Sequence, residues 1–126
     1  MLCHTAPHLK RLHLSYATGI TDLVSGPLQK LRLLEDLWLD GTQITDAALV
    51  PLQNLTLLTE LGLASTKGIT DAAFKHLPQR HPLLKRLELG HTSITDVGVG
   101  YLQPCRNLKT LHLNHTDITN VALQHL

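Results

Sequence analysis

The sequence contains few aromatic residues: they make up 3% of the chain, although hydrophobic residues as a whole make up 43%. Leucine must therefore fill the interior, which suits many thin and similar layers better than one large irregular core. No run of eighteen apolar residues occurs, so the sequence predicts no membrane-spanning segment. The two cysteines, Cys3 and Cys105, lie near opposite ends of the chain and form no disulfide framework.

Neither sign of charge dominates, because 11 Lys and Arg residues face 10 Asp and Glu residues, for a formal net charge of +1. This balance gives no electrostatic footprint for nucleic acid or an anionic membrane, so we predict that the protein binds neither. The first residues, MLCHTAPHLKRL, lack the apolar core of a secretory signal. Together with the cysteine usage, this predicts a cytoplasmic protein, and a nuclear location stays open.

The sequence contains five copies of one repeat, with the pattern L-x-x-L-x-L-x-x-T-x-I-T-D-x-A-L-x-x-L. The first leucines of consecutive copies are Leu9, Leu34, Leu58, Leu84 and Leu108. We therefore predict a single domain over 1–126, made of about five units, with 1–8 as the tail of a preceding unit. The units span 9–33, 34–57, 58–83, 84–107 and 108–126.

This pattern resembles the leucine-rich repeat family, in particular the class in which an "ITD" sequence follows the strand. F-box-associated eukaryotic proteins carry such arrays, and protozoan and bacterial proteins with "TGITD" units are similar. The resemblance covers essentially the whole chain. It implies the α/β fold class: a leucine-rich repeat solenoid with a curved parallel β-sheet on the concave face and helices on the convex face.

Each part of the unit also has a physical role of its own. The L-x-L alternation predicts a short strand with its leucines on one face. The isoleucine fills the core, and the Thr-Asp pair caps the following helix. One column contains Thr42, Thr66, Thr92 and Thr116. Their hydroxyls are expected to form hydrogen bonds with backbone groups of the buried turn, from one coil to the next. Because helices are about twice as wide as the strand spacing, the stack must bend toward the strands.

The helical side of each unit should turn apolar residues inward, and neither end carries an atypical capping unit. We therefore expect the chain to be a fragment of a longer array. The alternative is a small protein whose ends frustrate pairing, or self-associate with another copy. The residues expected to face inward are Leu49, Phe74, Val99, Leu123, Leu52, Leu77, Leu102 and Leu126.

The side chains at strand positions between the leucines are expected to form a grid on the concave face. They are not needed to pack the core. Trp38 lies in this grid, and an exposed tryptophan is typical of binding hot spots. The surrounding carboxylates predict a mildly acidic patch, and Gly62, Ala64 and Gly90 predict a shallow depression that suits a basic or amphipathic partner. The predicted partner-binding residues are Trp38, Asp36, Asp40, Glu60, Glu88, Arg86, His13 and His112.

Evidence for a metal site or catalysis is weak. His91 and His115 share one column, but a metal wants three or four ligands, and only Glu88 and Asp117 are near, so we predict no metal and no cofactor. Ser15 and His13 share a face, yet only Asp40, at a distance, could orient them, which is too little for a triad. Cys3 and Cys105 fall at equivalent places that tolerate a small buried thiol.

We therefore predict a protein that is not an enzyme and binds a protein partner on its concave sheet. The resemblance to F-box-associated arrays implies one concrete version, substrate recognition for a ubiquitin ligase, although this sequence contains no F-box helices. The alternative is a structural spacer within a longer repeat protein, with its concave face unused.

Overall fold

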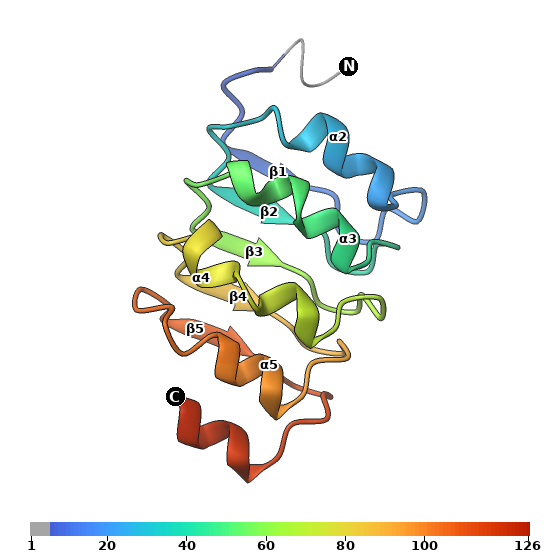
Figure 1. Ribbon diagram of the computed structural model, residues 1–126. Helices are drawn as coiled ribbons and strands as arrows, with labels where there is room; N and C mark the ends of the chain where they lie inside the picture. Colours follow the sequence, from blue (N-terminus) through green and yellow to red (C-terminus); the bar gives the residue numbers. More distant parts are fainter. Residues whose placement is uncertain (1–5) are drawn as a thin grey trace.

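The computed structural model describes residues 6–126, so Cys3 and most of the predicted tail at 1–8 lie outside it. Each of the five units contributes one strand of three residues. The strands form one parallel sheet in the order β1-β2-β3-β4-β5, so units that follow one another in sequence lie side by side (Figure 1). The strands are β1 (Arg11–His13), β2 (Asp36–Trp38), β3 (Glu60–Gly62), β4 (Arg86–Glu88) and β5 (Thr110–His112).

The register of the sheet is the one predicted from the repeat. Leu37 pairs with Leu12 on one side and with Leu61 on the other, and Trp38 pairs with His13 and Gly62. The same columns continue into β4 and β5. The strand positions on either side of the paired leucines therefore form two columns across the sheet, as the predicted grid requires.

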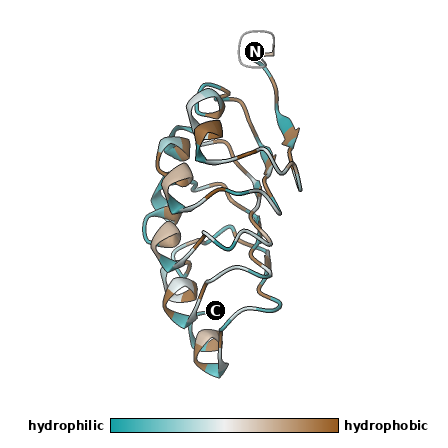
Figure 2. Cartoon of the chain, turned by 90° about the vertical axis from the view of Figure 1, so that its right-hand side faces the viewer, coloured by the Kyte–Doolittle hydropathy of each residue, from teal (hydrophilic) through white to brown (hydrophobic). Residues whose placement is uncertain are grey.

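Short helices cover the other side of the stack, so the molecule has a strand layer and a helix layer (Figure 2). Prolines at Pro51 and Pro78 begin new turns and keep the helical segments short. No helix in the described part of the chain could cross a membrane. The segments are η1 (Asp22–Val24), α2 (Ser25–Leu28), α3 (Asp46–Leu49), η2 (Pro51–Asn54), η3 (Asp71–Phe74), α4 (Leu77–Arg80), α5 (Asp96–Tyr101) and η4 (Asn120–His125).

Leucines and isoleucines between the two layers form the core. In the three inner units the strand leucines are at most 1% exposed. The outer units are more open, and the expectation that Leu123 and Leu126 face a covered interior is wrong, because they are 65% and 69% exposed. Both belong to the last described unit, whose outer side has no neighbouring coil among residues 6–126.

The threonines after the strands provide hydrogen-bond partners for backbone carbonyls of the buried turn. They do so within their own unit, not from coil to coil as expected. The hydroxyl of Thr42 donates to the carbonyl of Leu39 at 2.6 Å, within its own unit. Thr66, Thr92 and Thr116 make the equivalent bond three residues back.

The contact between coils is instead made by the aspartate at each helix start. Its carboxylate accepts the backbone N–H and the hydroxyl of the threonine that caps the next helix. For Asp71 and Thr95 the two distances are 2.7 Å and 2.5 Å. The hydroxyl and backbone bonds from Thr119 likewise lower the pKa of Asp96. This Asp–Thr ladder comprises the pairs Asp22–Thr45, Asp46–Thr70, Asp71–Thr95 and Asp96–Thr119.

One core position holds a titratable group. His81 is 3% exposed and occupies the column that Leu31 and Leu55 fill in earlier units. Its Nδ1 lies 3.1 Å from the carbonyl oxygen of Leu55, so this nitrogen carries the proton and donates it. Burial lowers the pKa of His81.

The ladder predicts that Asp71→Ala destabilises the fold. The substitution removes two charge-assisted hydrogen bonds between coils, so the free energy of unfolding should fall by about 1–3 kcal/mol. Urea denaturation followed by circular dichroism measures this. Asp117→Ala is the matched control, since Asp117 is exposed and lies outside the ladder. Equal effects of the two substitutions would contradict a structural role for the ladder.

His81 predicts a loss of stability in acid. As the pH falls through about 6.5, an unfolded histidine takes up a proton, whereas the lowered pKa in the folded state resists it. Stability is therefore present above this pH and is lost as the pH falls toward the folded pKa. Urea unfolding at pH 7.5 and pH 5.5 should show a smaller loss for His81→Leu than for the parent, while exposed His76→Leu should behave as the parent does.

Candidate protein-binding surface on the concave sheet

Trp38 lies on the outer side of the sheet, turned away from the leucine core, as predicted. Its indole covers Gly62 of the next strand, so closely that an added Cβ there would collide with the ring. The ring of His13 meets it edge-on at 5.9 Å between centroids. From the other side the guanidinium of Arg86 lies over the ring, 5.5 Å from its centroid. The indole is therefore partly buried and fixed from both sides.

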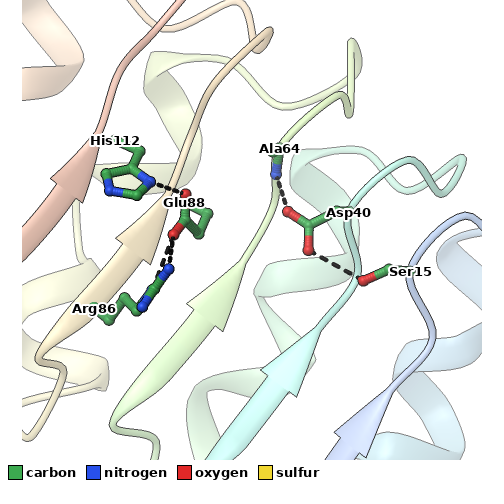
Figure 3. A network of polar contacts seen from close by, with 6 residues as sticks. All are labelled: Ser15, Asp40, Ala64, Arg86, Glu88 and His112. Atoms are coloured by element: carbon green, nitrogen blue, oxygen red, sulfur yellow. Dashed lines mark hydrogen bonds and ion pairs between the residues drawn. The ribbon is translucent and has the colours of Figure 1, made fainter.

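Arg86 belongs to a charge network that continues to β5 (Figure 3). Its Nη2 and Nε lie 2.8 Å and 2.9 Å from Oε1 of Glu88. The other oxygen of Glu88 lies 2.5 Å from Nδ1 of His112. Glu88 thus binds Arg86 and His112 together, and the side chain of Glu88 is only 13% exposed.

Asp40 lies deeper than the sequence suggested. It is 8% exposed, and its two oxygens accept hydrogen bonds from the hydroxyl of Ser15 at 3.1 Å and the backbone N–H of Ala64 at 2.8 Å (Figure 3). The carboxylate therefore joins three consecutive coils and offers little charge to a partner.

The remaining predicted carboxylates are Asp36 and Glu60. Asp36 pairs with Arg11 at 3.3 Å and is 17% exposed on its side chain, whereas Arg11 is 79% exposed. Glu60 has no ion-pair partner among residues 6–126. Arginines thus pair with two of the four predicted carboxylates, Asp36 and Glu88, and a partner meets their guanidinium groups as well as the carboxylates.

The predicted depression beside Trp38 is absent from the described structure, because neighbouring side chains fill it. The indole covers Gly62, and the side-chain amide of Asn114 lies over Gly90. A hollow of about 330 Å³ lies instead at the strand ends, between the turns that follow β2 and β3. Its lining residues are Gly41, Thr42, Gln43, Ile44, Thr45, Ser65, Lys67 and Gly68.

Sequence reasoning missed the backbone conformation of the column that follows the strands. All five of its residues have positive φ, between 55° and 67°, although only Gly41 is a glycine. His91 and His115 stack there with centroids 4.3 Å apart and an angle of 14° between their planes. Imidazole lone pairs lie in the ring plane, so two stacked rings do not converge on one ion. The available signal was Gly41 together with His91 and His115, because glycine and histidine are enriched at positive φ.

The residues considered for catalysis are not connected into a triad. Ser15 donates to Asp40, while the ring of His13 contacts Trp38. No group of three metal-ligating side chains occurs in the part of the chain that the structure describes. Cys105 is half-buried, and burial raises the pKa of its thiol. It lies after α5, at the predicted place.

Comparison with known proteins agrees with this geometry. A family model described as "Leucine Rich repeat" matches residues 80–102 and 105–126, the last two units. The chain therefore carries leucine-rich repeats in its C-terminal part. The parallel sheet of five strands with helices on its other side is the solenoid expected of such repeats. The proposed kinship with F-box-associated arrays remains a prediction.

Solved leucine-rich repeat structures superpose on almost the whole chain. An internalin from Listeria monocytogenes matches with a TM-score of 0.76 and 28% identity, over 95% of this chain and 33% of that one. Internalin C2 of the same species matches with a TM-score of 0.73 and 28% identity, over 94% and 48%. The chain therefore spans less than half the length of either.

The actin-binding site 2 of leiomodin-1 shares the fold, with a TM-score of 0.69 and 18% identity over 90% of this chain and 75% of that one. No curated protein matches the sequence.

The fit of the indole over Gly62 gives a direct test, because Trp38 is the only tryptophan. Gly62→Ala places a methyl group where the ring lies, so the ring should lift into solvent. We expect a red-shifted emission and stronger quenching by acrylamide. Gly19→Ala is the matched control, since nothing lies within 4 Å of a Cβ at that position. Unchanged fluorescence in Gly62→Ala would contradict the described packing.

Proposed function

We propose that this repeat array binds a protein partner on its concave sheet, with Trp38 at the centre of the contact. Leucine-rich repeat domains generally mediate protein–protein interaction and are typically not enzymes. The observation that supports the proposal here is the indole held on the outer face of the sheet by Gly62, His13 and Arg86. A side chain fixed in this way loses little further entropy on binding.

The surface around Trp38 mixes apolar and paired charged groups. Arg86, Glu88 and His112 flank the indole on one side, and Arg11, His13 and Asp36 on the other. Arginine and tryptophan are both enriched in hot spots, and an arginine already paired can still donate to a partner. Asp40 is left out of this surface, because its carboxylate is occupied between coils.

Leiomodin-1 offers a parallel, since the matched region of that protein is an actin-binding site on the same fold. The partner of this chain could be the substrate of a ubiquitin ligase, a version that rests only on the resemblance of the repeats to F-box-associated arrays. A cytoplasmic location for this interaction, with a nuclear one left open, remains a prediction from the sequence.

Two alternatives to this proposal are a structural spacer and self-association. A structural spacer needs only the stacked core and leaves the concave face without a ligand. Self-association needs the ends, where exposed Leu123 and Leu126 and the outer strands β1 and β5 present apolar surface and open sheet edges. A concentration series in sedimentation velocity tests self-association. The Trp38→Ala variant described below distinguishes a structural spacer from a protein-binding module.

The binding proposal predicts that Trp38→Ala weakens partner binding at least tenfold, because truncation of a hot-spot tryptophan costs about 2 kcal/mol or more. Partners captured by the parent are identified, purified and titrated against the variant by calorimetry. Lys75→Ala, on the helix side, should bind as the parent does. A Trp38→Ala protein that folds and keeps every partner at full affinity would refute the proposal.

A further inference from the structure

Charged residues are divided between the two edges of the sheet. The strands begin along one edge, on the left in Figure 1, which we call the strand-start edge and define as 6–10, 30–35, 54–59, 80–85 and 103–109. It carries seven cationic side chains and a single carboxylate, that of Glu35. The cations are Lys10, Lys30, Arg32, Arg80, Lys85, Arg106 and Lys109.

The opposite edge, where the strands end and the helices start, has the reverse composition. Its one cation is Lys67, and its six carboxylates are Asp22, Asp40, Asp46, Asp71, Asp96 and Asp117. The Asp–Thr ladder requires most of these acids, whereas nothing in the repeat requires a charge at the strand-start edge. The overall net charge of +1 therefore conceals a strongly basic edge. The prediction that the protein binds neither nucleic acid nor an anionic membrane was based on this sum, which combines a basic edge and an acidic one.

The cations of the strand-start edge are available to a ligand. Only Lys10 is engaged in an ion pair, with Glu35 at 3.7 Å; the other six have none within the described chain. Lys85 and Lys109 lie on adjacent coils, since the backbone N–H of Lys109 donates to the carbonyl of Lys85 at 2.8 Å. Both side chains are exposed, as is that of Arg106.

A line of leucines runs along the same edge. Leu33, Leu57 and Leu83 take the same position in three consecutive coils and are 37%, 37% and 42% exposed. Each precedes the buried leucine that begins its unit, so the repeat does not need them for its core. Three adjacent apolar side chains flanked by unpaired cations make an elongated amphipathic surface.

We propose that the strand-start edge is a second docking surface, and that it takes an acidic protein segment carrying aliphatic side chains. The carboxylates of such a segment complement the unpaired cations, and its aliphatic groups cover the leucines. A bilayer fits less well, because the leucines are more than half covered and cannot insert. Nucleic acid fits less well, because no Phe, Tyr or Trp lies on this edge to stack a base.

A fluorescein-labelled peptide of alternating Glu and Leu is the probe, followed by fluorescence anisotropy with the full chain. The parent should bind it, and more tightly as salt is lowered. Lys85→Glu with Lys109→Glu should weaken binding at least tenfold. The matched control reverses the same number of charges at Lys67 and Lys75, away from this edge, and should change the affinity less than twofold. Circular dichroism confirms that both double variants fold.

Two further comparisons sharpen the test. A Glu–Ser peptide should bind more weakly than the Glu–Leu peptide, which isolates the leucine line without altering the protein. Trp38→Ala should bind the Glu–Leu peptide as the parent does. The proposal for this edge is therefore tested independently of the proposal for the concave face.

Equal loss of affinity in both double variants would overturn the proposal, as would equal binding of the two peptides. It would also be overturned if phosphatidylserine vesicles or duplex DNA bound while the Glu–Leu peptide did not. Salt-sensitive self-association without peptide binding would assign the edge to the acidic edge of a second copy, and would overturn the proposal as well.

Discussion

The structure depends on the in-register stacking of consecutive coils, and the aspartate at each helix start is the group that fixes this register on the helix side. One carboxylate binds two donors of the next coil, the backbone N–H and the hydroxyl of its capping threonine. On the strand side, the parallel backbone ladder does the same work. With both sides fixed, each leucine meets its equivalent in the neighbouring unit, and the core grows one layer at a time.

This stacking also decides what the surface can be. Trp38 can cover Gly62 only because β2 and β3 are in register, and Arg86 reaches the indole from β4 for the same reason. The Asp–Thr ladder collects acids at one edge of the sheet, and the other edge is left to basic residues. A concave face centred on tryptophan and a basic edge lined with leucine are both consequences of one repeated unit.

The repeat made the fold predictable from sequence. The spacing of the leucines within a unit predicts the strand, and the alignment of the units predicts how neighbouring strands pair. Single residues were harder to place. Asp40 was predicted as an exposed acid but bonds Ser15 and Ala64, since its position in the turn after β2 also faces the neighbouring coils. Gly62 looked like a hollow, yet small residues in a stack make room for the next side chain. Net charge, being a sum, could not reveal the basic edge.

The most direct test of in-register stacking is the NMR contact between the indole protons of Trp38 and the Hα protons of Gly62. These residues are 24 positions apart in sequence but adjacent across the β2–β3 ladder. Strong nuclear Overhauser effects between them, without any from the indole to the methyl groups of Leu37 or Leu39, are the expected result. Effects from the indole to those core methyl groups instead would contradict the outward tryptophan and the register on which both proposed surfaces depend.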